Sequence, residues 1–248
     1  MNVCFLGTNG WYDSITGHTV CILVETDNAI VVLDAGSGLY KAQRYFTYEK
    51  PVHLFLSHLH LDHIIGLHVL NKFLLPQGLT IHCGQGMSEY LKAIIAAPYS
   101  MPLKDLAYRV RINELEDDLY SADGFKVSCA QMVHSVPTIG FRFEADGKSL
   151  AYCPDTGYCE NAIRLAKRVD FLITECAFRT GERDDHWPHL NPETAAMLAC
   201  EAEVKQLALV HFDAYRYPDL QSRKIAESVA QSIFTHSMIT TDDQCFEI

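Results

Sequence analysis

The sequence predicts a four-layer αββα sandwich, in which two packed sheets are covered by helices on their outer faces. Strand-like runs dominate the start of each half of the chain, and strands alternate with helices in the second half. No stretch is rich in Pro, Gly and Ser as a linker would be. With 248 residues, 48% of them hydrophobic, the chain can bury a full core. We therefore expect one domain over residues 1–248.

The first half is expected to begin with strands. Apolar runs flank the turn-forming cluster at 26–28, which predicts a hairpin. Two helices should follow, one at 62–75, where apolar residues recur at helical spacing until Pro76, and one at 87–97. The strands predicted in this half are residues 1–7, 20–24, 30–33 and 52–56.

The second half alternates the two kinds of element. Its predicted strands are residues 125–133, 150–153, 171–174 and 207–210. Its predicted helices are residues 160–169, 192–202 and 220–234. The helix at 192–202 has the best-defined start, because Asn191 suits the N-cap and Pro192 suits the first helical position.

Composition limits the classes of function. The formal net charge of -11 disfavours unaided binding of long nucleic acid, which needs a basic surface, but allows a small anionic substrate beside bound metal. No apolar run reaches the roughly 18–20 residues that span a bilayer, so we expect no membrane association. The N-terminus lacks a secretory pattern, and nine scattered cysteines without a C-x-x-C pair fit reduced, buried thiols better than a disulfide framework. These features predict a cytoplasmic protein.

The chemistry is expected to start where the strand at 52–56 ends. His58 and His60 are two residues apart in an extended loop, so their imidazoles project to the same side, and Asp62 and His63 fall in the first turn of the next helix. Four possible ligands thus come from six residues. A solvated polar loop would be the ordinary alternative, but the carboxyl end of a strand is where α/β proteins commonly build sites.

Three later residues each follow a predicted strand, namely His134, Asp155 and His211. Taken singly, such a residue is more often an ordinary hydrogen-bonded group. Their shared placement would bring all three to one edge of the sandwich, next to the first cluster. The sequence therefore predicts a metal centre held by His58, His60, Asp62, His63, His134, Asp155 and His211.

Five imidazoles and two carboxylates suit two divalent ions, with zinc favoured and manganese or iron(II) open. The simplest allocation gives one ion His58, His60 and His134. It gives the other ion Asp62, His63 and His211, with Asp155 between the two. A water bridging two such ions would lose a proton near neutral pH and act as the nucleophile.

On these residues the chain resembles the metallo-β-lactamase superfamily, whose signature is the H-x-H-x-D-H string found at 58–63, followed by single His, Asp and His ligands. The expected αββα arrangement rests partly on this resemblance. It also implies that Asp34, in Leu33-Asp34-Ala35-Gly36, supports the metal loop without binding metal; a turn residue that caps a strand end is the alternative. Asp62 is a catalytic candidate as well as a ligand.

The segments at 174–178 and 189–195 resemble the branch of ribonuclease Z and the cyclic-phosphate phosphodiesterases. A carboxylate in place of His60 would be typical of the oxidoreductase branch, so hydrolysis is favoured. The resemblance implies that His189 is a catalytic residue that donates a proton to the leaving oxygen or contacts a phosphoryl oxygen. His186 is its rival three residues earlier, and a purely structural role at the helix entry is the alternative.

The interval from His134 to Asp155 is 21 positions, which leaves no room for the tRNA-gripping arm that ribonuclease Z carries there. This favours a phosphodiesterase acting on a small or cyclic phosphodiester over a tRNA 3′ endonuclease. Possible rim residues of the pocket are Trp11, Tyr12, Tyr215 and Arg216, although such aromatics often only pack under loops.

Two other functions stay open at this point. The same metals could hydrolyse a lactone, thioester or β-lactam by polarising its carbonyl. A non-catalytic binding protein that has kept the fold is a third possibility, but no ligand of the signature is missing. By resemblance alone we expect a homodimer.

Overall fold

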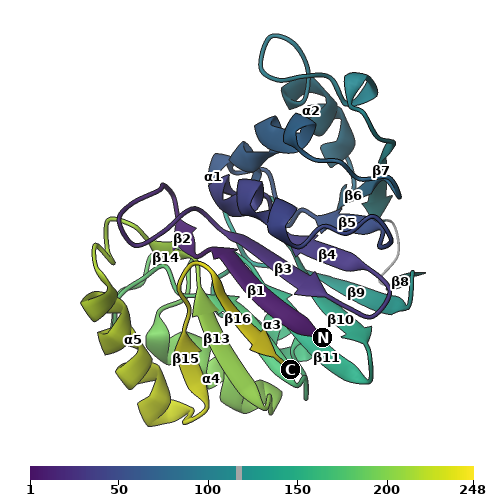
Figure 1. The fold of residues 1–248 in the computed structure, drawn as a ribbon. Helices are drawn as coiled ribbons and strands as arrows, with labels where there is room; N and C mark the ends of the chain where they lie inside the picture. The colour runs from purple at the N-terminus through teal and green to yellow at the C-terminus, as the bar shows by residue number, and fades with distance from the viewer. Residues whose placement is uncertain (116–118) are drawn as a thin grey trace.

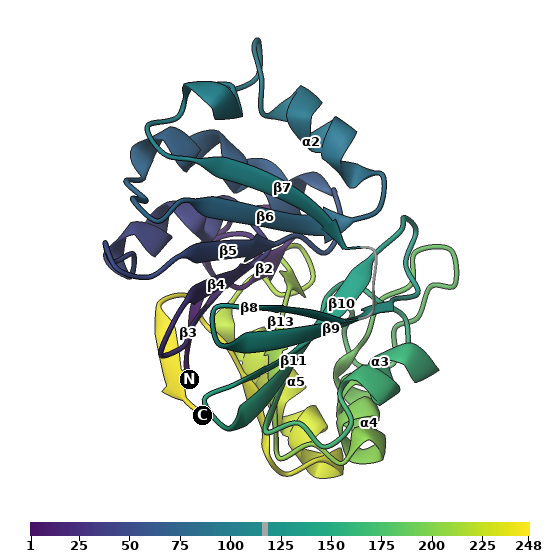
Figure 2. The same ribbon diagram turned by 90° about the vertical axis from the view of Figure 1, so that its right-hand side faces the viewer.

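The computed structural model describes residues 1–115 and 119–248, and it confirms the αββα sandwich. Two large sheets pack face to face, and helices cover the outer face of each (Figures 1 and 2). Alternate residues of a strand point to opposite faces of its sheet. In the first strand, Phe5 accordingly packs between the sheets, while Leu6 packs under the helices. Both faces are buried, which explains the continuous apolar runs of the sequence.

The first sheet has seven strands among the described residues. The hairpin predicted around 26–28 is present, with Ile22 opposite Leu33, and the strands after it run parallel. In spatial order the strands are β16 (Gln244–Glu247), β1 (Asn2–Gly7), β3 (Cys21–Glu25), β4 (Ile30–Leu33), β5 (Val52–Phe55), β6 (Leu79–Gly84) and β7 (Val110–Leu115).

The second sheet also has seven described strands, of which β11, β12, β13 and β15 run parallel. Their carboxyl ends therefore share one edge of the sheet. In spatial order they are β15 (Ser237–Ile239), β13 (Gln206–Val210), β12 (Phe171–Glu175), β11 (Lys148–Cys153), β10 (Ile139–Ala145), β9 (Phe125–Gln131) and β8 (Leu119–Ala122). At that edge β2 (Asn9–Gly10) pairs with β14 (Phe212–Asp213), as Figure 1 shows.

Helices complete the outer layers. The first sheet is covered by η1 (Ser37–Arg44), α1 (Leu61–Ile64), η2 (Ile65–Lys72), α2 (Met87–Ile94) and η3 (Leu103–Asp105). The second is covered by α3 (Glu160–Leu165), α4 (Pro192–Ala202) and α5 (Leu220–Ile233). Within the described residues, none of the helices has the length and apolar character to cross a membrane.

The helix predicted at 62–75 was wrong in kind. Only α1 is α-helical, and the chain then tightens into the 3₁₀ helix η2. Gly66 accounts for the change, because its amide donates to the carbonyl of Ala35 (2.8 Å) and a Cβ there would lie 2.2 Å from the carbonyl oxygen of Gly36. The helices predicted at 87–97 and 160–169 end earlier, at Ile94 and Leu165.

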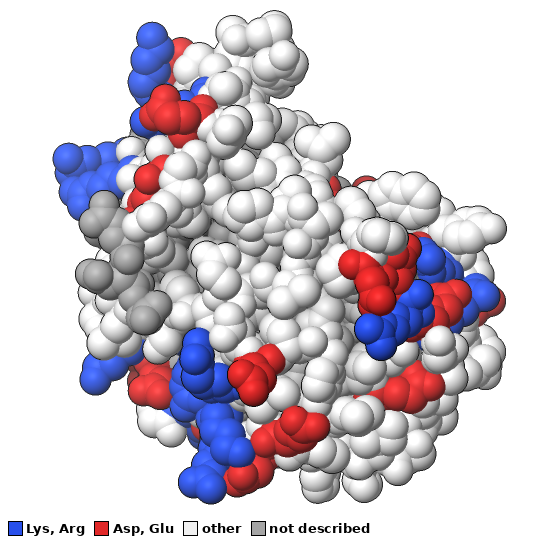
Figure 3. All heavy atoms as spheres, turned by 180° about the vertical axis from the view of Figure 1, so that it is seen from behind, with Lys and Arg blue, Asp and Glu red and all other residues white. Residues whose placement is uncertain are grey.

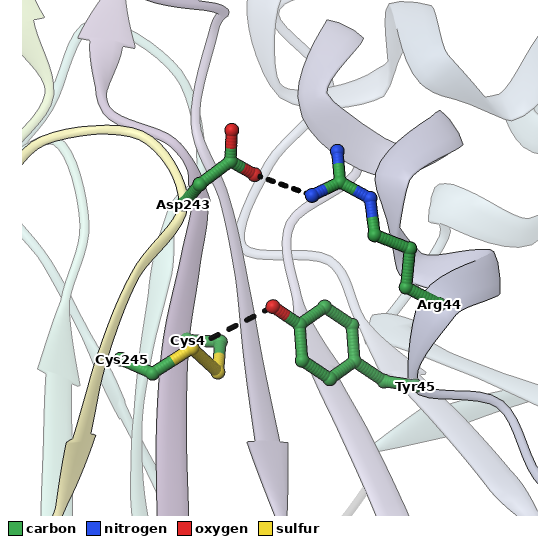
Figure 4. The surroundings of a disulfide bond; sticks show 5 residues. All are labelled: Cys4, Arg44, Tyr45, Asp243 and Cys245. Atoms are coloured by element: carbon green, nitrogen blue, oxygen red, sulfur yellow. Dashed lines mark hydrogen bonds and ion pairs between the residues drawn. A yellow bond between two sulfur atoms is a disulfide. The ribbon is translucent and has the colours of Figure 1, made fainter.

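The expectation of reduced cysteines was also wrong at one point. Cys4 in β1 and Cys245 in β16 form a disulfide (Figure 4), while Cys21, Cys83, Cys153 and Cys176 are buried thiols. The two strands are antiparallel neighbours with these residues opposite each other. The hydroxyl of Tyr45 lies 3.5 Å from the sulfur of Cys245, and an ion pair between Arg44 and Asp243 lies close by. The pairing was hidden because 241 positions separate the two cysteines.

Candidate active site

The loops after β5, β9, β11 and β13 meet at one edge of the sandwich and bring the predicted ligands together. In the first group, one atom each of His58, His60, His134 and Asp155 lies within 4.8 Å of the others. Nε2 of His134 is 3.3 Å from Nδ1 of His60. Oδ2 of Asp155 lies 3.8 Å from Nε2 of His58 and 3.7 Å from Nε2 of His134.

The second group contains Asp62, His63 and His211. Nε2 of His211 lies 3.1 Å from Nε2 of His63 and 3.2 Å from Oδ2 of Asp62. Both imidazole nitrogens are 3.2 Å from Oδ1 of Asp155. Asp155 therefore turns one oxygen to each group, so it lies between the two sets of side chains, as the predicted allocation places it.

Asp34 organises the loop from beneath. It is fully buried, with a left-handed φ of 57°, and Ser57 donates to it through both its amide and its hydroxyl, each at 2.8 Å. The Nδ1 of His63 (2.8 Å) and the hydroxyl of Tyr152 (2.7 Å) donate to Oδ2, the oxygen that also accepts the Ser57 hydroxyl. The supporting contacts implied by the resemblance are thus present.

These contacts fix which nitrogen of each imidazole carries hydrogen. His63 donates from Nδ1 to Asp34, so its Nε2 keeps a lone pair that faces the centre. Ser57 gives its hydroxyl hydrogen to Asp34 and must accept one from Nδ1 of His58, 2.9 Å away. Nε2 of His58 is then also free to bind an ion. Two ligands are pre-oriented by one buried carboxylate.

The donor set fits divalent ions. Nε2 of His58 and Oδ1 of Asp155 are buried without a hydrogen-bond partner among the described residues, a costly arrangement that a cation would relieve. Burial and the neighbouring His63 lower the pKa of His58, which keeps its imidazole neutral. Burial raises the pKa of Asp155, but His211 and His63 lower it well below its ordinary value. Neutral imidazoles and ionised carboxylates are the ligand forms that zinc, manganese and iron(II) bind.

His189 lies beside this centre, before α4. Its Nδ1 is 2.7 Å from Oε1 of the buried Glu175, at the end of β12, and its ring is nearly parallel to that of His211, with centroids 5.9 Å apart. Burial disfavours the charged imidazolium, but the Glu175 carboxylate raises the pKa of His189 to about 9. Atoms of Asp155, His189 and His211 lie within 4.8 Å of one another, so His189 faces the reacting centre. His186 is exposed.

Sequence reasoning gave Glu175 no role. Besides His189, its carboxylate accepts the backbone amides of Thr156 (2.8 Å) and Ala177 (2.9 Å). It thereby ties the turn after Asp155 to the segment before His189. Its position directly at the end of a strand, shared with the predicted ligands, was the pattern that could have revealed it.

A pocket of about 630 Å³ opens over the centre. Of the predicted rim residues, Trp11 and Arg216 line it, whereas Tyr12 and Tyr215 lie outside the lining and are exposed. The backbone amide of Tyr215 donates to the Asp213 carboxylate (2.9 Å). Trp187, which the sequence did not single out, also lines the pocket.

Known protein families and sequences that resemble this chain agree with a metal-dependent hydrolase site. A family model described as the β-lactamase superfamily domain matches residues 30–212. The uncharacterised protein Rv1339 of Mycobacterium tuberculosis is 28% identical over 228 residues, which cover 88% of this chain and 81% of that protein. The ribonuclease Z of Microcystis aeruginosa is 25% identical over 311 residues, covering 100% of this chain and 96% of its own.

Solved structures share the fold. The metallo-β-lactamase fold protein YhfI from Bacillus subtilis superposes with a TM-score of 0.82 at 20% identity, over 99% of each chain. A diphosphatase from the PhnP family gives 0.75 at 15% identity, over 100% of this chain and 97% of that one. The chain therefore belongs to the β-lactamase superfamily, as a metallo-β-lactamase-fold hydrolase that resembles the ribonuclease Z branch.

Proposed function

We propose that the protein is a phosphodiesterase that hydrolyses a small phosphodiester, such as a cyclic nucleotide or a cyclic sugar phosphate, with two divalent metal ions. The observation that carries the proposal is the placement of His189 beside Asp155 and His211. Expulsion of an alkoxide from phosphorus is assisted by a proton donor, and His189 is placed to supply the proton.

The side chains have separate tasks in this proposal. Glu175 accepts the hydrogen on Nδ1 of His189 and holds the ring, so that Nε2 can donate to the leaving oxygen or to a phosphoryl oxygen. The backbone amide of Trp11 donates to Oδ2 of Asp62 (2.7 Å) and holds that carboxylate against His211. Two ions bound by the seven ligands would supply an activated water and would stabilise charge on the attacked phosphate.

Three observations support a small substrate. The pocket of about 630 Å³ suits a small molecule. Between His134 and Asp155 the chain forms β10, β11 and the short turn joining them, which use up the interval where ribonuclease Z carries its arm. On the face in Figure 3, Lys and Arg side chains lie among Asp and Glu and do not form a continuous basic surface.

The choice of phosphorus chemistry is supported by the comparisons. Two of the similar proteins are named a ribonuclease and a diphosphatase, both of which act on phosphorus esters or anhydrides.

Zinc is the ion we propose for both positions, with manganese and iron(II) as the alternatives that the donor set also suits. Metal analysis of the purified protein tests this assignment, and two equivalents of zinc per chain are expected. Cytoplasmic location and a homodimer stay predictions.

The function is tested with protein loaded separately with zinc and manganese. Bis(p-nitrophenyl) phosphate should be hydrolysed, while a chromogenic lactone and a β-lactam should not. Asp155→Ala should abolish the activity, and Asp185→Ala, which changes an exposed aspartate outside the pocket, should leave it intact. Turnover of the carbonyl substrates without phosphodiester cleavage would refute the proposal and favour an acyl hydrolase.

A further inference from the structure

The chain contains two tryptophans, and both line the pocket over the metal centre. Trp11 follows β2 and Trp187 precedes α4, so they come from distant parts of the chain. Large aromatic side chains are usually buried in a core. Here 65% of Trp11 and 47% of Trp187 remain exposed. Two exposed indoles at the mouth of one pocket need an explanation that packing does not provide.

The ring of Trp187 contacts three imidazoles of the site and is still partly exposed, with the ring of His189 tilted 53° to it at 6.3 Å. It stacks on the imidazole of His60, with an interplanar angle of 13° and centroids 5.4 Å apart, and it meets the ring of His134 edge-on at 5.6 Å. Its backbone amide donates to the carboxylate of Asp184 (3.2 Å). A ring fixed in this way is a ready surface for a second flat ring on its open side.

Trp11 is attached to the other group of ligands. Its φ of 72° is left-handed, a strained conformation for a side chain of this size, and the strain is offset where its amide donates to Oδ2 of Asp62. The indole packs edge-on against Tyr12, with centroids 5.2 Å apart. The two indoles thus border the centre beside different predicted ligands.

The cationic side chains in the described lining are already paired. His189, whose pKa is raised to about 9, is held by Glu175 (2.7 Å). Arg216 is the one Lys or Arg residue in the described lining, and its guanidinium donates to Glu182 (2.9 Å) and Asp213 (2.5 Å) while lying over the ring of Phe178. Two carboxylates therefore already balance it. The exposed side chain of Leu61 extends the apolar part of the wall. Away from the metal centre, a second phosphate group on the substrate would find no unpaired Lys or Arg among the described lining residues.

We propose that the substrate carries a flat, uncharged aromatic ring beside its single phosphodiester, and that Trp187 and Trp11 select it by stacking. The inference rests on the proposed phosphodiesterase function and narrows it. It favours a base-bearing cyclic nucleotide over a cyclic sugar phosphate, and it disfavours a nucleoside diphosphate. Stacking of a base on an aromatic side chain changes affinity by about 5- to 150-fold.

The two tryptophans also provide the measurement, because intrinsic indole fluorescence reports on this pocket alone. The zinc-loaded protein is titrated with three probes: adenosine 3′,5′-cyclic phosphorothioate, glycerol 1,2-cyclic phosphate and ADP. We expect saturable quenching by the first probe at concentrations about 5- to 150-fold lower than either other probe requires. Equal affinity for the glycerol and adenosine probes would overturn the proposal.

Variants assign the effect to the rings. Trp187→Leu should weaken binding of the adenosine probe, followed through Trp11, by about 5- to 150-fold, and Trp187→Phe should restore most of it. Tyr215→Leu, at an exposed aromatic outside the lining, is the matched control and should change nothing. If Trp187→Leu and Trp11→Leu both bind the adenosine probe as the unmodified protein does, the aromatic site does not exist.

The outcomes separate the inference from the function beneath it. Tryptophan-dependent binding of the adenosine probe without hydrolysis of any phosphodiester would refute the phosphodiesterase and retain the aromatic site. Hydrolysis of bis(p-nitrophenyl) phosphate with no preference for a ring-bearing probe would retain the phosphodiesterase function and refute the aromatic site. Because the comparison of probes uses the unmodified protein, it does not depend on whether a variant folds.

Discussion

His189 faces the ligand cluster with its ring held by a single carboxylate, Glu175. Replacing it with alanine should lower kcat by about 10²- to 10⁴-fold, because the leaving oxygen then departs without a proton donor. Bound metal, measured by elemental analysis, should stay at the unmodified level. His186→Ala, three residues away at an exposed position, is the control and should keep full activity. Loss of activity in His186→Ala alone would reverse the two assignments.

A substitution at Asp34 tests whether this buried carboxylate positions the metal-binding residues. In Asp34→Asn one accepting oxygen becomes a donating amide that faces the donors Ser57, His63 and Tyr152, while the left-handed backbone is tolerated by Asn. His63 then loses its fixed orientation, and metal affinity should fall about 10- to 100-fold. Competition with a chromophoric chelator measures the change. Unaltered affinity would reduce Asp34 to a turn residue.

Some residues of the site could be predicted from their neighbours in the sequence, whereas others depend on contacts that form only in the folded chain. His58 to His63 could be predicted because one short string carries four side chains, and Asp155 because it stands where a strand ends. Glu175 occupies the same kind of position, but its task depends on His189, which reaches it only in the folded chain. Trp187 could not be predicted, because its contact with His60 joins loops 127 positions apart.

Among the elements, α4 supports the site most directly, since it begins three residues after His189. Asn191 caps it by accepting the amide of Thr194 (2.9 Å), and the hydroxyl of Thr194 accepts the amide of Asn191 in return (3.0 Å). Asn191→Ala should lower the free energy of unfolding by about 1 kcal/mol, measured by urea denaturation. Asn191→Ser keeps a capping oxygen and should recover most of the loss. Equal stability of the two variants would show that the cap contributes nothing.

Elements with regular local patterns were predicted well. The helix at 192–202 matches α4 at both ends, because its cap is written in neighbouring residues. The prediction of a helix at 62–75 failed because the backbone of Gly66 packs against the carbonyls of Ala35 and Gly36. These residues are about thirty positions away in the sequence, so the local pattern could not reveal the contact. The strands β6, β7, β8 and β10 were missed, although all four belong to the two large sheets that carry the site.

At the scale of the molecule, the ligands come from both sheets. His58, His60, Asp62 and His63 follow a strand of the first sheet, and His134, Asp155 and His211 follow strands of the second. Ions bound between them would join the two layers, so removing metal should destabilise the whole fold. Metal at 1,000 times its Kd contributes about 4 kcal/mol. Calorimetry with excess EDTA should then lower Tm by roughly 8–16 °C.

Readdition of zinc should restore the transition. Asp155→Ala provides the comparison, because it removes the carboxylate that faces both groups. Its Tm should respond to EDTA far less than that of the unmodified protein. An EDTA response of the same size in both proteins would mean that the ions are not held between the sheets.

The disulfide between Cys4 and Cys245 has a mechanical consequence. The last residue is already beside the first, with the amide of Ile248 donating to the carbonyl of Met1 (3.1 Å). A force that pulls Met1 and Ile248 apart would pass through the sulfur atoms of the disulfide. It would bypass the 241-position span between Cys4 and Cys245. The sandwich would bear almost no load until a reductant cut the link. The force would then load the sandwich itself, and its complete unfolding would release roughly 800 Å of chain.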